Sequence, residues 1–454
     1  MTRHLVAALR LAFIALAIAI IAARPAAAQS ILRDTETESF FEDMTRPLAT
    51  AAGLDPRSLK VVLVNDPEIN AFVMQGQTIY LNAGLIRAAD NVQQVQGVVA
   101  HEMGHITGGH AVRFSEGVNQ ATGITIMSML LGAAVMAVGA PDAGMAILAG
   151  GQQAAMGKFL AFSRTQESSA DQAGATFLQK AGISGKGSLD FFRKLQNQEY
   201  RLAIPQKDSY DRTHPLTSER IAALETLYKA SPAWNKPPDP ALDARFQRVK
   251  GKLTGFVEDP GQVMRLYPET DTSIAARYAR AYAWHRTAYP DKAVKEVDAL
   301  IARDAHDPYF LELKGQILLE SGKPRDAIPP LREAVQRSGS KPMISALLGH
   351  ALIATEDPQY FSEAKQILKV SVQRDDDNPF AWYQLGLVYD REGDQPRAAL
   401  ATAERYSLEG NFNPALTNAE AAMRGLPPGT PDWIRAQDIA MVARNEAPSK
   451  RKRR

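Results

Sequence analysis

Two histidines flank a glutamate in the segment His101-Glu102-Met103-Gly104-His105, at a spacing that lets one helix hold a metal ion. The preceding residues 95–100 are mostly apolar and contain no proline, so the segment should be helical. A helix turns by about 400° over four residues, which brings both imidazoles to one face, about 6 Å apart. Glu102 would then lie beside the metal and take a proton from bound water. The alternative is a pair of structural histidines without a metal.

The composition restricts which side chains can bind that metal. The chain has 454 residues with 8 histidines and no cysteine, so disulfides, thiolate zinc sites, iron–sulfur clusters and cysteine nucleophiles are excluded. Hydrophobic residues make up 45% and charged residues 22%, which excludes a largely disordered, collagen-like or multi-spanning membrane protein. Any metal must therefore be held by histidine and carboxylate side chains.

A catalytic zinc usually has three protein ligands and a water molecule, so a third ligand is needed. His110 follows the motif, but on a continuous helix it would point away from His101, and we do not expect it to bind the metal. Glu167 and Asp171 are four residues apart and share one helical face. Glu167 can complete a His₂Glu site while Asp171 accepts the free N–H of a ligating imidazole. The alternative, a solvated acidic face, would leave the metal one ligand short.

Strand and helix patterns alternate in the first half of the chain. Residues 59–64 and 79–81 are short apolar runs that predict a small sheet, and long helical patterns follow. Prolines are frequent from residue 231 to residue 271, which indicates a linker. The predicted organisation is a signal segment (1–28), a mixed α and β domain (29–230), a Pro-rich linker (231–271), a helical repeat domain (272–445) and a basic tail (446–454).

A repeat of about 34 residues follows the predicted linker. Small residues recur at one position of the repeat and again on its next helix, at Ala279, Gly315, Gly349 and Gly386 and at Ala293, Ala327, Ala364 and Ala398. This period and the segment Trp382-x-x-Leu385-Gly386-x-x-Tyr389 are typical of tetratricopeptide repeats. Because one helix pair cannot bury its own apolar face, about four repeats with capping helices should stack into a solenoid. Its concave face predicts peptide or protein binding.

Four motifs occur in the order in which the M48 family of zinc metallopeptidases carries them, and the chain resembles that family. They are His101-Glu102-x-x-His105, Arg164-x-x-Glu167-x-x-Ala170-Asp171, Asn70-Ala71-Phe72 before Gly76 and Ile79, and Thr213-His214-Pro215 before Glu219-Arg220-Ile221. The resemblance implies one Zn²⁺ per chain, held by His101, His105 and Glu167, with Glu102 as general base. The expected fold class is α+β, mainly α, with a zincin-type metallopeptidase domain and a small sheet followed by an all-α tetratricopeptide solenoid.

The resemblance also implies roles for residues around the metal. Asn70, Ala71 and Phe72 would belong to an edge strand that pairs with the substrate backbone. His214 would be a conditional fourth ligand that can block the open position, and Arg220 would support the site.

The attached repeats make the chain similar to the repeat-bearing periplasmic M48 proteases of Gram-negative bacteria that act in β-barrel assembly. By that resemblance it would degrade misfolded or misassembled envelope proteins. The repeats would recruit substrates or the outer-membrane β-barrel assembly machinery, and no nucleic-acid partner is expected. The alternative is a chaperone or scaffold in which binding by the repeats dominates and proteolysis is tightly gated.

The first 28 residues have the pattern of a cleavable export signal, which predicts a periplasmic protein. Arg3 and Arg10 precede an apolar run, and small residues at 26–28 offer a cleavage site. The run of residues 11–23 would cover about 20 Å of a hydrocarbon core about 30 Å thick, which favours cleavage over a membrane anchor. Basic residues of the leader and at 450–454 account for the net charge of +2, so the body between them is acidic. We expect the basic tail to be a solvated end.

An uncharged run covers residues 121–140, and a second apolar stretch covers residues 143–155. The first is long enough to span a membrane, but a single span would separate His101 from Glu167 across the bilayer. We therefore expect a hydrophobic helical hairpin that either packs as core or lid or makes peripheral membrane contact through residues 121–155. Methionines at helical spacing usually mark packing, which favours core or lid.

Overall fold

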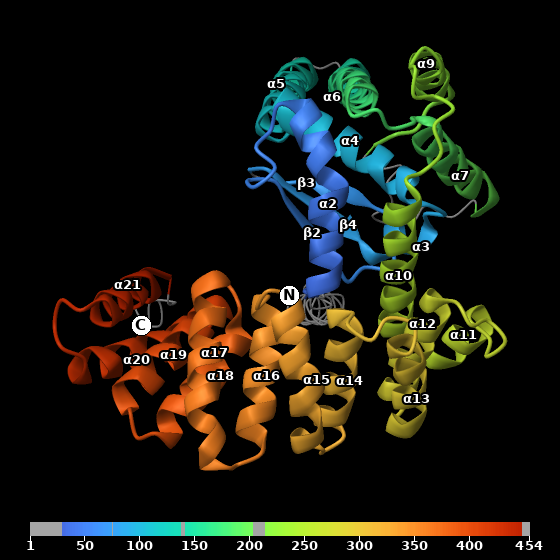
Figure 1. Cartoon of the computed structure of the whole chain (residues 1–454). Helices are drawn as coiled ribbons and strands as arrows, with labels where there is room; N and C mark the ends of the chain where they lie inside the picture. The colour runs from blue at the N-terminus through green and yellow to red at the C-terminus, as the bar shows by residue number, and fades with distance from the viewer. Residues whose placement is uncertain (1–29, 75, 138–140, 203–213, 447–454) are drawn as a thin grey trace, which may run out of the picture.

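The computed structural model describes residues 30–74, 76–137, 141–202 and 214–446. It confirms a mainly helical chain with a small sheet in its first half and a row of helix pairs in its second half (Figure 1). The predicted signal segment 1–28 and all but one residue of the predicted basic tail lie outside the described residues.

The sheet of the described region has four strands in the order β1-β2-β4-β3. They are β1 (Ile31–Leu32), β2 (Lys60–Val64), β3 (Ala71–Val73) and β4 (Thr78–Asn82). β2 and β4 pair in parallel, with Leu63 opposite Leu81, and the other two pairs are antiparallel. β3 is therefore an edge strand, and its Phe72 ring stacks on Tyr80 of β4 at a centroid distance of 5.0 Å.

The described first half has seven helices, which are α2 (Thr35–Ala52), α3 (Ala83–Ala88), α4 (Val92–Gly108), α5 (His110–Ala137), α6 (Pro141–Lys180), α7 (Lys186–Leu202) and α9 (Ser218–Lys229). Of these, α2, α3 and α4 pack on the sheet, and α4 and α6 carry the predicted metal ligands. α4 carries the His101 motif and packs against α2, α6 and α7, so every residue from Val92 to His105 is buried. Asn91 caps its first turn, and Gly109 ends it with a φ of 64°, which glycine adopts without strain.

α5 and α6 pair along their length and form the hairpin expected from residues 121–155. Four of the methionines on it, Met127, Met129, Met145 and Met156, are more than half exposed. The interpretation of this stretch as packed core is therefore wrong, because the two helices cover only the faces that they turn toward each other. By length and composition alone, residues 110–136 are one helix that could cross a membrane, and 11% of its most apolar window is buried.

The range predicted as a linker is largely helical in the structure. α10 (Pro240–Val257) and α11 (Pro260–Leu266) each begin with a proline, preceded by the capping residues Asp239 and Asp259. Proline is tolerated there because the first N–H groups of a helix have no partner within the helix. These prolines therefore mark helix starts. α10 packs on α2 and α3 and also on α12, so it joins the two halves of the chain (Figure 1).

Five helix pairs follow in the described residues and stack as the repeat predicts. They are α12 (Ile274–Arg286) with α13 (Pro290–Ile301), α14 (Pro308–Glu320) with α15 (Pro324–Arg337), α16 (Pro342–Ala354) with α17 (Phe361–Arg374), α18 (Pro379–Arg391) with α19 (Gln395–Leu408), and α20 (Phe412–Gly425) with α21 (Pro431–Glu446). A Cβ atom on Gly315 would lie 2.3 Å from the Leu331 side chain, and one on Gly349 would lie 2.6 Å from Leu368. In these two pairs, glycine on the first helix leaves room for a leucine on the second helix to pack directly against the backbone.

A buried group of charged residues connects α10 to the start of the chain and to the solenoid. Lys252 Nζ donates to Asp34 Oδ1 at 2.5 Å, and Arg248 pairs with Glu36 at 2.6 Å and with Asp307 at 2.7 Å. Burial alone would lower the pKa of Lys252, but the charge of Asp34 and the other acidic groups nearby raise it well above its usual value. Removing one partner would leave a buried charge unpaired, at a cost of about 3–5 kcal/mol. These contacts therefore link α10 to both halves of the chain, and loss of either partner should be destabilising.

Candidate metal centre

Small residues allow α4 and α6 to come into backbone contact. A Cβ atom on Gly104 would lie 2.6 Å from the carbonyl oxygen of Ala170, and one on Gly174 would lie 3.0 Å from the backbone of Ala100. Any larger residue at these glycines would push the helices apart. The close approach brings the histidine pair of α4 against the acidic pair of α6, so residues about 65 positions apart share one site.

Four buried side chains meet at this contact: His101, His105, Glu167 and His214. One donor atom from each lies within 4.8 Å of the others. His101 Nε2 is 3.1 Å from His105 Nε2, 3.2 Å from His214 Nδ1 and 3.4 Å from Glu167 Oε2. Glu167 Oε1 is 3.3 Å from His105 Nε2 and 3.0 Å from His214 Nδ1. The structure therefore brings together the three predicted ligands and the predicted conditional one.

These separations suit a tetrahedral metal ion. Zinc lies about 2.0–2.1 Å from nitrogen and oxygen ligands, so two ligand atoms of a tetrahedron are about 3.3 Å apart. Among the Nε2 atoms of His101 and His105, Nδ1 of His214 and Oε1 of Glu167, four distances lie between 3.0 and 3.3 Å, and the group as a whole lies within 4.8 Å. Four protein donors around one tetrahedral ion would fill all four of its positions. No position would then remain for a water molecule, as in a structural zinc site.

The pKa shifts of His101 and Glu167 indicate that the cluster attracts positive charge. Burial alone would lower the pKa of His101, but hydrogen bonds to Asp171 and Glu167 raise it to about 10. Burial alone would raise the pKa of Glu167, but the charge of His214 and the hydrogen bonds from His101, His105 and His214 hold it well below its usual value. Without a metal the cluster thus keeps a proton on His101, and a metal ion bound by these donors would replace that proton.

Asp171 and Arg220 surround the donors with a second set of contacts. Asp171 Oδ1 lies 2.9 Å from His101 Nδ1, which leaves Nε2 of that ring facing the cluster. Arg220 donates to both oxygens of Asp171, at 2.7 and 2.9 Å, and its Nη1 lies 3.0 Å from Glu167 Oε2. The same Nη1 donates to the carbonyl of Pro215 at 2.7 Å. Arg220 therefore ties the acidic pair of α6 to the segment that carries His214.

Glu102 is fully buried beside the cluster. Neither of its carboxylate oxygens has a hydrogen-bond partner among the described residues, and Oε1 lies 3.5 Å from His214 Nε2. A buried carboxylate without a partner is costly, and such groups are found where a ligand or water molecule completes the site. This position is suited to a group that takes up a proton from water held beside it.

His110 is a residue whose place the sequence reasoning missed. That reasoning assumed a continuous helix, but α4 ends at Gly108 and α5 begins at His110. His110 Nδ1 consequently lies 2.9 Å from His105 Nδ1, outside the four-donor cluster but against one of its members. The two consecutive glycines before His110 were the available signal, because glycine commonly ends a helix. A contact of this kind fixes which ring nitrogen of His105 faces the cluster.

The predicted edge-strand residues lie at the open side of the sheet. Asn70 is buried, and its Oδ1 accepts a hydrogen bond from the backbone N–H of Ala71 at 2.9 Å. The Asn70 carbonyl accepts another from the backbone N–H of Asn82 at 3.0 Å, which fixes the start of β3 against β4. β3 packs beside α4, so this sheet edge runs past the helix that carries the histidine motif.

Residues 35–228 match the model of Peptidase family M48. These residues form an M48 peptidase domain. The M48 domain makes the chain a metalloprotease, and the family implies a metal, which the donor cluster fits.

Curated relatives support this assignment. The β-barrel assembly-enhancing protease of Escherichia coli K12 is 27% identical over 86% of this chain and 80% of its own length. The protein of that name from Yersinia pestis is 27% identical over 78% of this chain and 72% of its own length. Among solved structures, the tetratricopeptide protein YrrB is 18% identical with a TM-score of 0.32, over 39% of this chain and 92% of its own.

Proposed function

We propose that the chain is a zinc-dependent endopeptidase of the bacterial envelope that degrades misfolded or misassembled outer-membrane proteins. The observation that supports the zinc assignment is the set of four donors within 4.8 Å of one another, beside a buried carboxylate that no described residue hydrogen-bonds. His101, His105 and Glu167 hold the ion, as the sequence motifs predict.

The chemistry of peptide hydrolysis follows from this arrangement. Zinc bound by these residues would polarise the scissile carbonyl and make a bound water molecule acidic enough to lose a proton near neutral pH. Glu102 takes that proton and later delivers it to the leaving amine. Asp171 holds His101 in the tautomer that turns Nε2 to the cluster, and Arg220 keeps Asp171 in place.

His214 gates the site in this proposal. As a fourth ligand it would take the position at which water or a carbonyl oxygen has to bind, and its place within 4.8 Å of the other three donor atoms supports this role. Displacement of His214 would open that position directly beside Glu102, which lies 3.5 Å from the His214 ring. The Arg220 contact to Pro215 keeps the His214 segment near the metal site in the closed form.

The edge strand β3 supports selection of unfolded chains. A peptide that adds to the Asn70-Ala71-Phe72 edge pairs through its backbone and must be extended. A folded protein cannot present such a segment without local unfolding. Selection would therefore depend on disorder more than on one preferred side chain.

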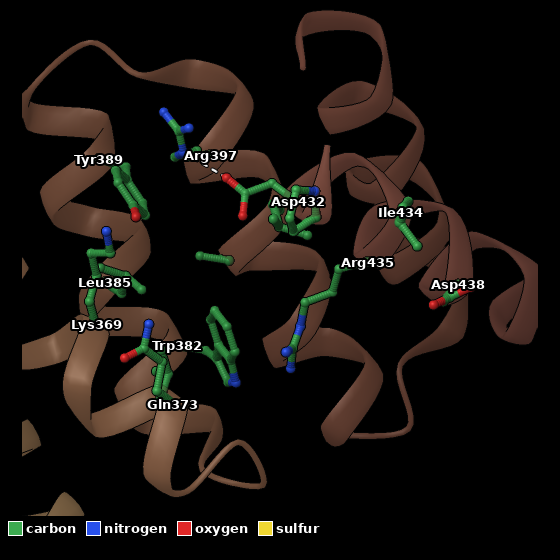
Figure 2. A pocket seen from close by; sticks show the side chains of 14 residues that line it. Lys369, Gln373, Trp382, Leu385, Tyr389, Arg397, Asp432, Ile434, Arg435 and Asp438 are labelled. Carbon is green, nitrogen blue, oxygen red and sulfur yellow. Dashed lines mark hydrogen bonds and ion pairs between the residues drawn. The ribbon is translucent and has the colours of Figure 1, made fainter. Parts of the chain in front are cut away.

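The solenoid offers a place for partner recruitment. A cavity of about 610 Å³ lies between α17, α18, α19 and α21 (Figure 2). Trp382, Leu385 and Tyr389 line one side of it, and the Arg435 guanidinium lies over the Trp382 ring at 4.8 Å. Cavities of this size that combine aromatic surface with a few polar groups suit a side chain or short peptide segment. We propose that it binds substrates or assembly partners.

The envelope location rests on two supports. The relatives carry the name β-barrel assembly-enhancing protease, and the leader has the pattern of a cleavable export signal. We therefore place the protein in the periplasm.

The proposal predicts zinc-dependent cleavage of an unfolded outer-membrane β-barrel protein. The purified chain with one equivalent of zinc should convert the urea-denatured and diluted substrate into fragments. The same substrate folded in detergent micelles should remain intact, because its strand edges are already paired. Gel electrophoresis over time measures both, and a chelator-treated sample serves as control. Absence of fragments with a substrate that nevertheless stays soluble would indicate a chaperone and contradict the protease function.

Removal of the Asp171 carboxylate should weaken zinc binding. Asp171→Asn loses the charged acceptor for His101 Nδ1 and the bidentate contact with Arg220. Loss of such an outer partner typically lowers metal affinity by about 10–100-fold. Competition with a chromophoric chelator measures the change. Asp190→Asn, an exposed position on α7, is the matched control and should bind zinc like the unchanged chain. Equal affinity of both variants would contradict the role of Asp171.

A further inference from the structure

His110 is a buried histidine beside the metal centre that the proposed chemistry does not use. It begins α5, is 6% exposed and is not among the four donors. Its Nδ1 atom lies 2.9 Å from His105 Nδ1, and the two rings meet edge to face at 80°. Two ring nitrogens at this distance share one hydrogen, so one of them donates and the other accepts.

The direction of this hydrogen bond follows from the other side of the His105 ring. His105 Nε2 faces the donors, at 3.1 Å from His101 Nε2 and 3.3 Å from Glu167 Oε1. A histidine binds a metal through an unprotonated nitrogen. When His105 is a ligand, its hydrogen must therefore be on Nδ1, which donates to His110. His110 Nδ1 is then the acceptor, so His110 must be a neutral imidazole with its own hydrogen on Nε2.

Two adjacent glycines place the His110 ring, and each does so for a different reason. Gly109 ends α4 with a φ of 64°, and its N–H donates to the carbonyls of His105 and Ile106. The chain thus turns directly after the histidine helix. A Cβ atom on Gly108 would lie 2.4 Å from His110 Nε2, so a larger residue there would displace the ring. The backbone of this turn therefore specifies the contact between His110 and His105.

The two histidine ligands have partners of different charge. His101 Nδ1 lies 2.9 Å from a carboxylate oxygen of Asp171, whereas His105 Nδ1 has the imidazole of His110. A charged acceptor makes a stronger hydrogen bond and a more basic ligand, which donates more electron density to the metal. A neutral acceptor orients the ring with less of this effect. A carboxylate at position 110 would therefore bind zinc more tightly and leave it a weaker Lewis acid.

We propose that His110 is a positioning residue of the zinc site, which orients His105 as a neutral hydrogen-bond acceptor and so preserves the electrophilic character of the metal. The proposal rests on the zinc site of the proposed function. His110 acts only through His105 and contacts neither the metal position nor the substrate.

Two variants of the same shape test the orienting role. In His110→Asn, Oδ1 is two bonds from Cβ, as Nδ1 is in histidine, and can accept the hydrogen bond, whereas the equally branched side chain of His110→Leu cannot. His110→Leu should lower zinc affinity about 10–100-fold, and His110→Asn should bind zinc like the unchanged chain. Competition with a chromophoric chelator measures both. In the zinc-loaded chain with ¹⁵N-labelled histidine, the His105 Nδ1–H signal should persist in His110→Asn and exchange away in His110→Leu.

His110→Asp tests the role of the neutral acceptor. It should bind zinc more tightly than His110→Asn and, at saturating zinc, cleave an unfolded substrate more slowly. Equal zinc affinity of His110→Leu and His110→Asn overturns the proposal, and so does His110→Asp with no tighter binding than His110→Asn. The second comparison decides the matter even if His110→Leu does not fold. Both comparisons measure zinc binding, so their failure is distinct from an absence of cleavage by the unchanged chain, which would contradict the proposed function.

Discussion

Replacement of Glu102 by glutamine should lower turnover of an unfolded substrate by about 10²- to 10⁴-fold, which is the range that a positioned general base contributes. Glutamine keeps the shape of the side chain but cannot take a proton from water. Glu102 is not among the four donors at tetrahedral spacing, so the zinc content should remain one per chain. Single-turnover cleavage and elemental analysis of the same preparation would measure the two quantities.

Glu219→Gln is the control for this experiment, because Glu219 is an exposed glutamate of the same domain, in the first turn of α9. Its turnover should equal that of the unchanged chain. Turnover by Glu102→Gln equal to that of the control would exclude Glu102 as the base and with it the proposed protease mechanism. A variant that loses zinc together with activity would instead place Glu102 among the metal ligands.

Replacement of His214 by alanine should raise basal hydrolysis of a short fluorogenic peptide about tenfold or more. The activity of a gated site is reduced by the fraction of molecules that are open, so a site open one tenth of the time gains about tenfold when the gate is removed. Zinc affinity should fall at the same time, because one of the four donors is lost. The assay uses saturating zinc so that the two effects are separated.

The control for the gate is His306→Ala, which removes an exposed histidine of the solenoid that pairs with Glu333. It should change neither quantity. If His214→Ala leaves both basal cleavage and zinc affinity unchanged, His214 is not a gate. A fall in cleavage at saturating zinc would also contradict the gate and would indicate that the ring is needed for the reaction itself.

Local pattern was enough to predict the parts of the fold that depend on periodicity. The helix around His101 and the repeated helix pairs follow from apolar spacing and from small residues such as Gly315, whose structural reason is the close Leu331 side chain. The pairing of the histidine motif with Glu167 was also accessible, because a metal needs a third ligand and cysteine is absent.

Features that depend on contacts between residues distant in sequence could not be predicted from local sequence patterns. The sequence motif implied a conditional role for His214, but only the structure places its Nδ1 atom 3.2 Å from His101 Nε2 and 3.0 Å from Glu167 Oε1. The contact of His110 with His105 depends on a break between two helices that a continuous-helix argument overlooks. Pro240 and Pro260 were interpreted as linker residues, although each begins a helix whose burial depends on neighbours distant in sequence. The exposure of the hairpin likewise depends on what the rest of the chain leaves uncovered.

The buried charges around Lys252 keep the solenoid at a set distance from the M48 domain. α10 is held both to the M48 domain and to the solenoid, so the gap between the repeat cavity and the metal centre has a fixed length. If the cavity binds a partner as proposed, that partner would reach the metal only with a disordered tether long enough to cross the gap. Cleavage sites should therefore begin at a minimum number of residues from the docked segment, whatever the local sequence. Partners whose loose ends are shorter than this distance would be held and released intact.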